Sequence, residues 1–75
     1  MRPHDIREWL TAQPFVPFRL CLTDGSAYDI KNPDMAMVSQ STVNIGVDPD
    51  PNGIVERFVR RSLLHIVKIE DLQPA

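Results

Sequence analysis

The feature that most constrains this chain is Asp24-Gly25, which interrupts an apolar run within "FRLCLTDGSAYDI", residues 18–30. Glycine adopts a positive φ at little steric cost, so a three-residue loop ending at Gly25 is typical of a β-hairpin with a glycine bulge. The predicted pairs are Phe18 with Ile30, Arg19 with Asp29, Leu20 with Tyr28, Cys21 with Ala27 and Leu22 with Ser26. Apolar residues then share one face, and an opposite-charge pair lies on the other. Asp24 and Gly25 are therefore predicted to form a structural turn.

A second hairpin is predicted in "MAMVSQSTVNIGV", residues 35–47, after a break at Asn32-Pro33-Asp34. A turn at Gln40-Ser41 pairs Val38 with Val43 and Ala36 with Ile45, which matches apolar with apolar residues. Residues 48–53 are rich in Pro, Asp, Asn and Gly and are expected to form a loop. Two more strands are predicted over residues 54–61 and 65–70, joined by a short turn at 62–65.

A short helix is predicted at about residues 5–13. Asp5 and Glu8 have the spacing of a capping box, in which each carboxylate accepts a hydrogen bond from a backbone N–H of the first turn. Apolar residues follow at helical spacing, which gives one stripe about two turns long. Pro14 ends the helix because proline lacks an N–H group and disfavours helical geometry in the residue before it.

The composition indicates one small globular domain covering residues 1–75. Hydrophobic residues make up 43% and charged residues 24%, close to globular averages, and the net charge of −2 gives no general attraction to nucleic acid or anionic membranes. The single cysteine, Cys21, has no partner for an internal disulfide. The chain shows no apolar stretch typical of a secretion signal or a membrane span, so we expect a cytoplasmic protein.

The order of these elements resembles the Sm-like (LSm) small barrel, with "FRLCLTDG" near the start and "RRSLLHIVKIE" near the end as the most similar segments. Residues 14–25, with Pro33-Asp34, are also similar to a group of short bacterial proteins marked by "PF-x-PFR-x-x-L-x-DG". These resemblances imply an α+β, mainly β fold. A short N-terminal helix would precede a five-stranded, strongly bent antiparallel SH3/Sm-like barrel at about residues 17–70.

No catalytic or metal site is predicted. "DPDPNG", residues 48–53, matches the first half of a calcium loop, but Val59 occupies the position of the bidentate glutamate. His4, Cys21 and His65 are the only histidines and thiol, too few for a four-ligand structural zinc site. Cys21 is expected in mid-strand and His65 in a turn, and their roles stay open. We expect no cofactor.

Binding is the predicted activity, because a barrel this small fills its interior with side chains and leaves no evident cavity for a small-molecule substrate. We expect a non-enzymatic interaction module that binds itself or a protein partner through free sheet edges. Packing of the helix against the barrel is the favoured explanation of Phe15 and Val16, and they are candidates for a partner surface if they are exposed.

The alternative is an Sm-like RNA-binding protein that acts as a homo-oligomer through Arg57, Arg60 and Arg61. Guanidinium groups bind phosphate as bidentate donors. The resemblance places Arg60 and Arg61 where the last loop of Sm proteins lines a central RNA site. Charges on a strand also serve to prevent edge-to-edge aggregation.

Overall fold

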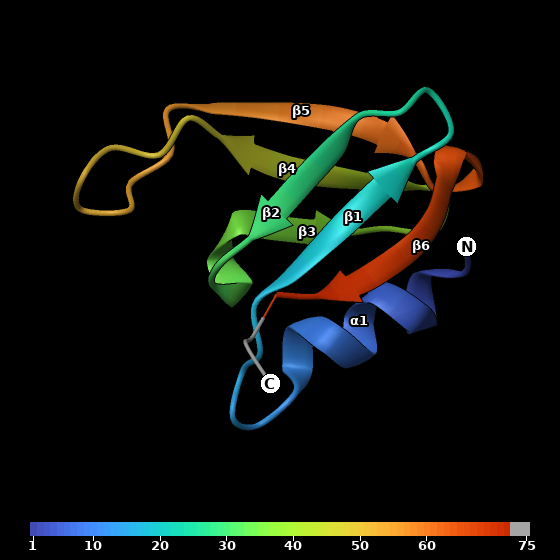
Figure 1. The fold of residues 1–75 in the computed structure, drawn as a ribbon, viewed down its shortest axis with the longest axis horizontal. Helices are drawn as coiled ribbons and strands as arrows, with labels where there is room; N and C mark the ends of the chain where they lie inside the picture. Colours follow the sequence, from blue (N-terminus) through green and yellow to red (C-terminus); the bar gives the residue numbers. More distant parts are fainter. Residues whose placement is uncertain (73–75) are drawn as a thin grey trace.

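The computed structural model describes residues 1–72, which form one N-terminal helix followed by six strands (Figure 1). The elements are α1 (Pro3–Thr11), β1 (Phe18–Leu22), β2 (Ala27–Ile30), η1 (Pro33–Met35), β3 (Ala36–Val38), β4 (Thr42–Val47), β5 (Arg57–Ser62), η2 (Leu63–His65) and β6 (Ile66–Asp71), where η marks a 3-10 turn. The strands form two antiparallel sheets: sheet A, in the order β2-β1-β6, and sheet B, in the order β3-β4-β5. The fold is therefore α+β and mainly β.

The predicted five-stranded, strongly bent SH3/Sm-like barrel is not seen in residues 1–72, which contain six strands in two separate three-stranded sheets and no closed barrel. Pro33 has no N–H group to donate, and the side chain of Asn32 accepts a hydrogen bond from the Asp34 N–H at 3.0 Å. These residues form η1, so β2 and β3 are not one continuous bent strand. At the other connection the Ser62 hydroxyl accepts from the Leu64 N–H at 3.2 Å, and η2 separates β5 from β6.

The first hairpin has the predicted register. Phe18 pairs with Ile30, Arg19 with Asp29, Leu20 with Tyr28 and Cys21 with Ala27. In the loop, Gly25 has a φ of +88° and donates to the carbonyl of Leu22 at 3.1 Å. The Asp24 carboxylate accepts from both the backbone N–H and the hydroxyl of Ser26, at 2.9 and 2.6 Å. The turn is thus held by the backbone geometry of one residue and the side chain of its neighbour.

The second hairpin also has the predicted register, with Ala36 opposite Ile45 and Val38 opposite Val43. The strand that follows starts at Arg57 rather than at Ile54. Residues 54–56 are still part of the preceding loop, because the backbone N–H of Asp50 donates to the carbonyl of Ile54 at 2.9 Å.

The helix begins and ends two residues earlier than predicted, and the assignment of its cap was wrong. Pro3 opens α1, a position where the missing N–H costs nothing. Asp5 is the third residue of the helix, and its carboxylate accepts from the backbone N–H of Arg2 at 3.2 Å. Glu8 lies 2.8 Å from the imidazole of His4.

The core lies between the two sheets, with α1 packed along one side of the molecule (Figure 1). Phe18 is completely buried, and its ring centroid lies 5.4 Å from that of Trp9 and 6.0 Å from that of Phe15. The other large, fully buried side chains are Ile6, Leu20, Ile30, Val43 and Ile45. Tyr28 shares the inner face of sheet A but is only partly buried, at the margin of this core.

Candidate interaction surfaces

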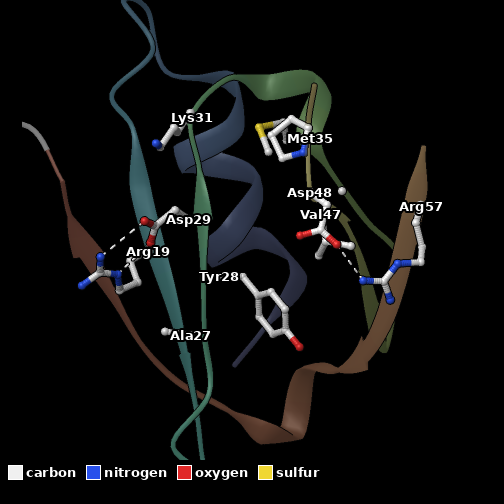
Figure 2. A pocket seen from close by; sticks show the side chains of 11 residues that line it. Arg19, Ala27, Tyr28, Asp29, Lys31, Met35, Val47, Asp48 and Arg57 are labelled. Atoms are coloured by element: carbon white, nitrogen blue, oxygen red, sulfur yellow. Dashed lines mark hydrogen bonds and ion pairs between the residues drawn. The ribbon is translucent and has the colours of Figure 1, made fainter. Parts of the chain in front are cut away.

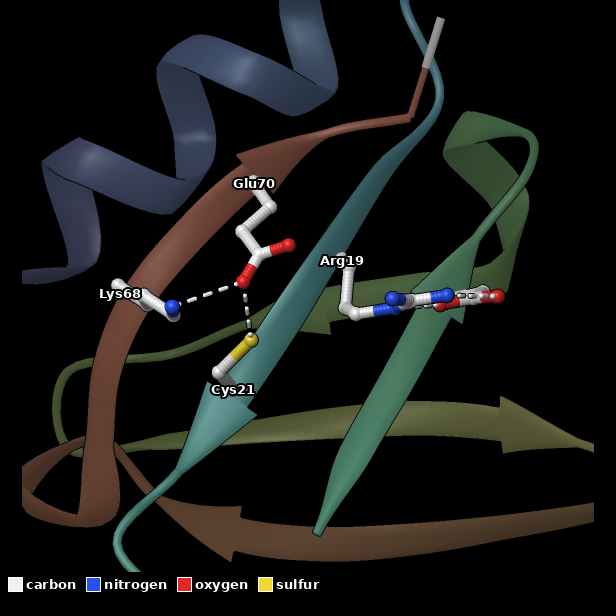
Figure 3. A network of polar contacts seen from close by, with 5 residues as sticks. Arg19, Cys21, Lys68 and Glu70 are labelled. Carbon is white, nitrogen blue, oxygen red and sulfur yellow. Dashed lines mark hydrogen bonds and ion pairs between the residues drawn. The ribbon is translucent and has the colours of Figure 1, made fainter. Parts of the chain in front are cut away.

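The outer face of sheet A is polar and its charges are paired with one another (Figure 3). Arg19 contacts Asp29 through two hydrogen bonds, Nε to Oδ1 at 2.7 Å and Nη2 to Oδ2 at 3.3 Å. On β6, Lys68 Nζ lies 2.9 Å from Glu70 Oε1, and the thiol of Cys21 donates to the same oxygen at 3.5 Å. This face therefore presents satisfied ion pairs to the solvent.

These contacts also determine the protonation of the groups involved. The hydrogen bond from Arg19 lowers the pKa of Asp29, and the hydrogen bond from Lys68 lowers the pKa of Glu70. Partial burial and the hydrogen bond to Glu70 raise the pKa of the Cys21 thiol. An activated cysteine nucleophile requires the opposite shift, so the surroundings of Cys21 favour a neutral strand residue.

The outer face of sheet B is different because it exposes large apolar side chains. Met37 on β3 is 70% exposed and Phe58 on β5 is 54% exposed. Gly46 on β4 lies opposite Phe58 on β5. The methyl groups of Val55 cover Gly46 and would lie only 2.9 Å from a Cβ at that position. We call Met37, Val55 and Phe58 the sheet B patch. The 63% exposed Ile54 adjoins it in the chain.

The three arginines predicted to bind nucleic acid do not form one patch. Arg60 lies on the outer face of sheet B, with its Nε 3.4 Å from the side-chain oxygen of Asn44. Arg57 and Arg61 alternate with it and face the other way. Arg57 makes a 2.9 Å ion pair with Asp48. Successive side chains of a strand point to opposite faces, so the sequence itself separates position 60 from positions 57 and 61. The prediction of one arginine cluster did not take this alternation into account.

Arg61 is held against Tyr28, across the gap between the two sheets. Its Nη2 donates to the Tyr28 hydroxyl at 2.9 Å, and the guanidinium carbon lies 5.6 Å from the centre of the ring. Its Nη1 donates to the carbonyl of Arg60 at 2.9 Å. These contacts fix one guanidinium orientation and link β5 to β2 at one end of the gap.

The predicted partner-surface residues lie in the connection from α1 to β1. Phe15 is partly buried and packs on Phe18, which accounts for its apolar character. Val16 lines a hollow of about 280 Å³ together with Trp9 and Asp71. Both residues are partly accessible, and Phe15 also packs against the core.

A larger cleft, of about 570 Å³, lies between β2 and the adjoining ends of β4 and β5 (Figure 2), and no pattern in the sequence indicated it. Its lining combines apolar and charged side chains: Arg19, Ala27, Tyr28, Asp29, Lys31, Met35, Val47, Asp48, Pro49 and Arg57, with Gly46. The cleft arises because the sheets are not joined on this side. It therefore depends on the placement of β2 and β5, which no local pattern encodes.

No group of three or more histidine, cysteine or acidic side chains within residues 1–72 is arranged to hold a metal ion. In the loop after β4, one carboxylate oxygen of Asp50 accepts from the N–H groups of Asn52 and Ile54, both at 2.9 Å. This oxygen of Asp50 is thus occupied in turn formation, and Asp48 is in an ion pair with Arg57. His65 lies in η2, where its carbonyl accepts from the Thr23 N–H at 2.8 Å.

Comparisons with known proteins do not assign a function to these surfaces. Over residues 1–72, no helix has the length and apolar character needed to cross a membrane. The chain matches no protein-family model, no curated protein and no solved structure.

Proposed function

We propose that this chain is a non-enzymatic interaction module that binds a protein surface, its own or a partner's, through the sheet B patch. The observation that carries the proposal is the difference between the two outer faces. Sheet A presents two ion pairs and one exposed apolar side chain, Val67, whereas the outer face of sheet B exposes both Met37 and Phe58 on neighbouring rows of the sheet. Burial of such side chains stabilises a complex by roughly 1.5–3 kcal/mol each when it is complete.

The face of sheet B is a better candidate than the free edge of β5. An edge strand offers unpaired N–H and C=O groups to another strand. Here that edge carries Arg57, Arg60 and Arg61, and pairing of β5 with a second β5 would bring like charges together. Packing of one sheet B patch on another keeps Arg57 and Arg61, which face the other way, out of the interface and gives a two-fold symmetric pair.

We also propose that the two sheets are the halves of an open SH3/Sm-like barrel. β1 pairs with both β2 and β6, and η1 and η2 carry the chain between the sheets on either side. This order of strands supports the resemblance. It supports a scaffold only, since the same fold serves many functions.

The test compares Phe58→Ser with Val67→Ser in sedimentation velocity over a range of concentrations. Val67 is a matched control because it is equally exposed, at 55%, and lies on β6, in sheet A. We expect the wild-type protein and Val67→Ser to associate, or to retain the same co-purified protein, and Phe58→Ser to lose this association. A wild-type protein that stays monomeric without a partner, or equal behaviour of the two variants, contradicts the proposal.

RNA binding remains the alternative proposal, through Arg57, Arg60 and Arg61. It predicts retained RNA whose affinity falls steeply with salt and drops in the double variant Arg60→Ala with Arg61→Ala. The separation of these arginines on opposite faces of β5, and the contact of Arg61 with Tyr28, favour the protein-binding proposal.

A further inference from the structure

The cleft between β2 and β5 has a mixed lining that is suited to an extended chain. Figure 2 shows the Tyr28 ring standing between the two strands, with Met35 at one end and Val47 on the wall of β4. These three side chains provide an apolar floor. The volume of about 570 Å³ lies within the range of about 300–1,000 Å³ that is usual for ligand sites.

The charges around the cleft are positive in excess, although the whole chain has a net charge of −2. Arg19 is bound to Asp29 by two hydrogen bonds and is neutralised. Lys31 is exposed and forms no side-chain ion pair within the described residues 1–72, although its charge helps to lower the pKa of Asp29. Lys31 thus shares Asp29 with Arg19, and the lining carries three cationic side chains, Arg19, Lys31 and Arg57, against two carboxylates, Asp29 and Asp48.

Arg57, on the opposite wall, is available to a competing anion. Its ion pair with Asp48 joins side chains that are 64% and 81% exposed. Pairs this exposed contribute little, about 0–1 kcal/mol, so Arg57 can exchange Asp48 for another carboxylate at small cost. Lys31 and Arg57 thus offer two anchors for acidic groups, one on each side of the cleft.

The backbone of β2 adds a third element of recognition. β2 is an edge strand of sheet A and pairs only with β1 among the described residues. Its other edge presents N–H and C=O groups toward the cleft, where an added strand would form main-chain hydrogen bonds. Alternate side chains of such a strand would point to the apolar floor and to the charged rim.

We propose that this cleft binds an extended acidic segment of another protein by strand addition to β2, with its carboxylates at Lys31 and Arg57 and its apolar side chains over Tyr28, Met35 and Val47. This site is separate from the sheet B patch, so the two proposals stand or fall independently.

The test uses a fluorescein-labelled peptide of alternating glutamate and valine, about eight residues long, and measures fluorescence anisotropy at low and physiological salt. We expect saturable binding that weakens about tenfold or more in Lys31→Glu and in Arg57→Glu. Arg7→Glu, an exposed site on α1, makes the same change in net charge and is expected to retain nearly full affinity. A peptide N-methylated at alternate residues is expected to lose binding, because it cannot pair with β2.

Several outcomes overturn the proposal. One is the absence of binding by the acidic peptide; another is equal binding by a lysine-valine counterpart. A loss of peptide affinity in Arg7→Glu as large as in Lys31→Glu indicates general electrostatic attraction and also overturns the proposal. Full binding by the N-methylated peptide overturns it as well. A labelled oligouridine that binds the same cleft in place of the peptide assigns the cleft to nucleic acid instead.

Discussion

At the scale of single residues, Gly25 controls the first hairpin through its backbone conformation. Its φ of +88° is strained for residues with a Cβ, and a Cβ built there meets no atom within 4 Å. A substitution at Gly25 is therefore opposed by backbone geometry and not by a clash.

We expect Gly25→Ala to lower the free energy of unfolding by about 1 kcal/mol. Gly25→Asn is expected to cost less, because asparagine tolerates positive φ better than other residues with a side chain. Urea unfolding followed by the fluorescence of Trp9 measures both. Equal losses for alanine and asparagine would argue against a conformational cause.

The residue scale also shows why some predictions succeeded and one failed. The pairs across Gly25 followed from the two-residue period of strands and one glycine, because only one register matched both apolar and charged residues. Asp5 was wrongly predicted to cap the helix, because its spacing to Glu8 matches a capping box and the effect of Pro3 on the helix start was left out. Proline suits the first helical turn, and it moves the helix start two residues ahead.

At the scale of elements, the loop after β4 folds back onto the sheet at Gly46. The methyl groups of Val55 occupy the space next to Gly46 that a side chain would need, at 2.9 Å from a built Cβ. The close approach explains the glycine in mid-strand and couples the loop to the patch that exposes Phe58.

Gly46→Ala is expected to destabilise the protein by roughly 1–3 kcal/mol, because valine is short and stiff and cannot move its methyl groups aside. In a Val55→Ala background the same change is expected to cost much less. A double-mutant cycle in urea measures the coupling between the two positions. Additive losses would show that Val55 does not lie on Gly46.

The elements also mark the limit of sequence patterns. Both hairpins were predictable, since their partners are close in the chain. The start of β5 was not, because Asp50 ties Ile54 into the loop through a contact that strand propensity does not describe. The division into two sheets depends on η1 and η2, where a few polar hydrogen bonds decide whether a strand bends or ends.

At the scale of the whole molecule, three carboxylates become more acidic on folding. The pKa of Asp24 is lowered by Ser26, that of Asp29 by Arg19 and that of Glu70 by Lys68. Between the ordinary pKa values of these carboxyl groups and their lowered values, the folded state binds fewer protons than the unfolded state. Stability is therefore complete above the ordinary carboxyl pKa values and is lost as the pH falls through the lowered ones.

We expect the free energy of unfolding to be nearly constant between pH 7 and about pH 5 and to decline progressively below it. Arg19→Gln removes the main cause of the lowered pKa of Asp29 and is expected to flatten this decline. Urea unfolding at a series of pH values provides the measurement. The same pH dependence in wild type and variant would exclude Asp29 as a contributor.

The cleft and the contrast between the two outer faces belong to this scale too, and neither was predicted. Each depends on the relative placement of strands that are far apart in the sequence. The residues themselves can be read in the sequence, but local periodicity does not show that no element would cover Met37 and Phe58.

The position of Cys21 has a practical consequence. It is the only cysteine, it is partly accessible, and it lies on the charged face of sheet A, away from Met37 and Phe58. A maleimide-coated chip would therefore tether every copy in one orientation, with the apolar side turned to the flowing analyte. Because the thiol is less acidic than usual, the coupling reaction calls for mildly alkaline buffer.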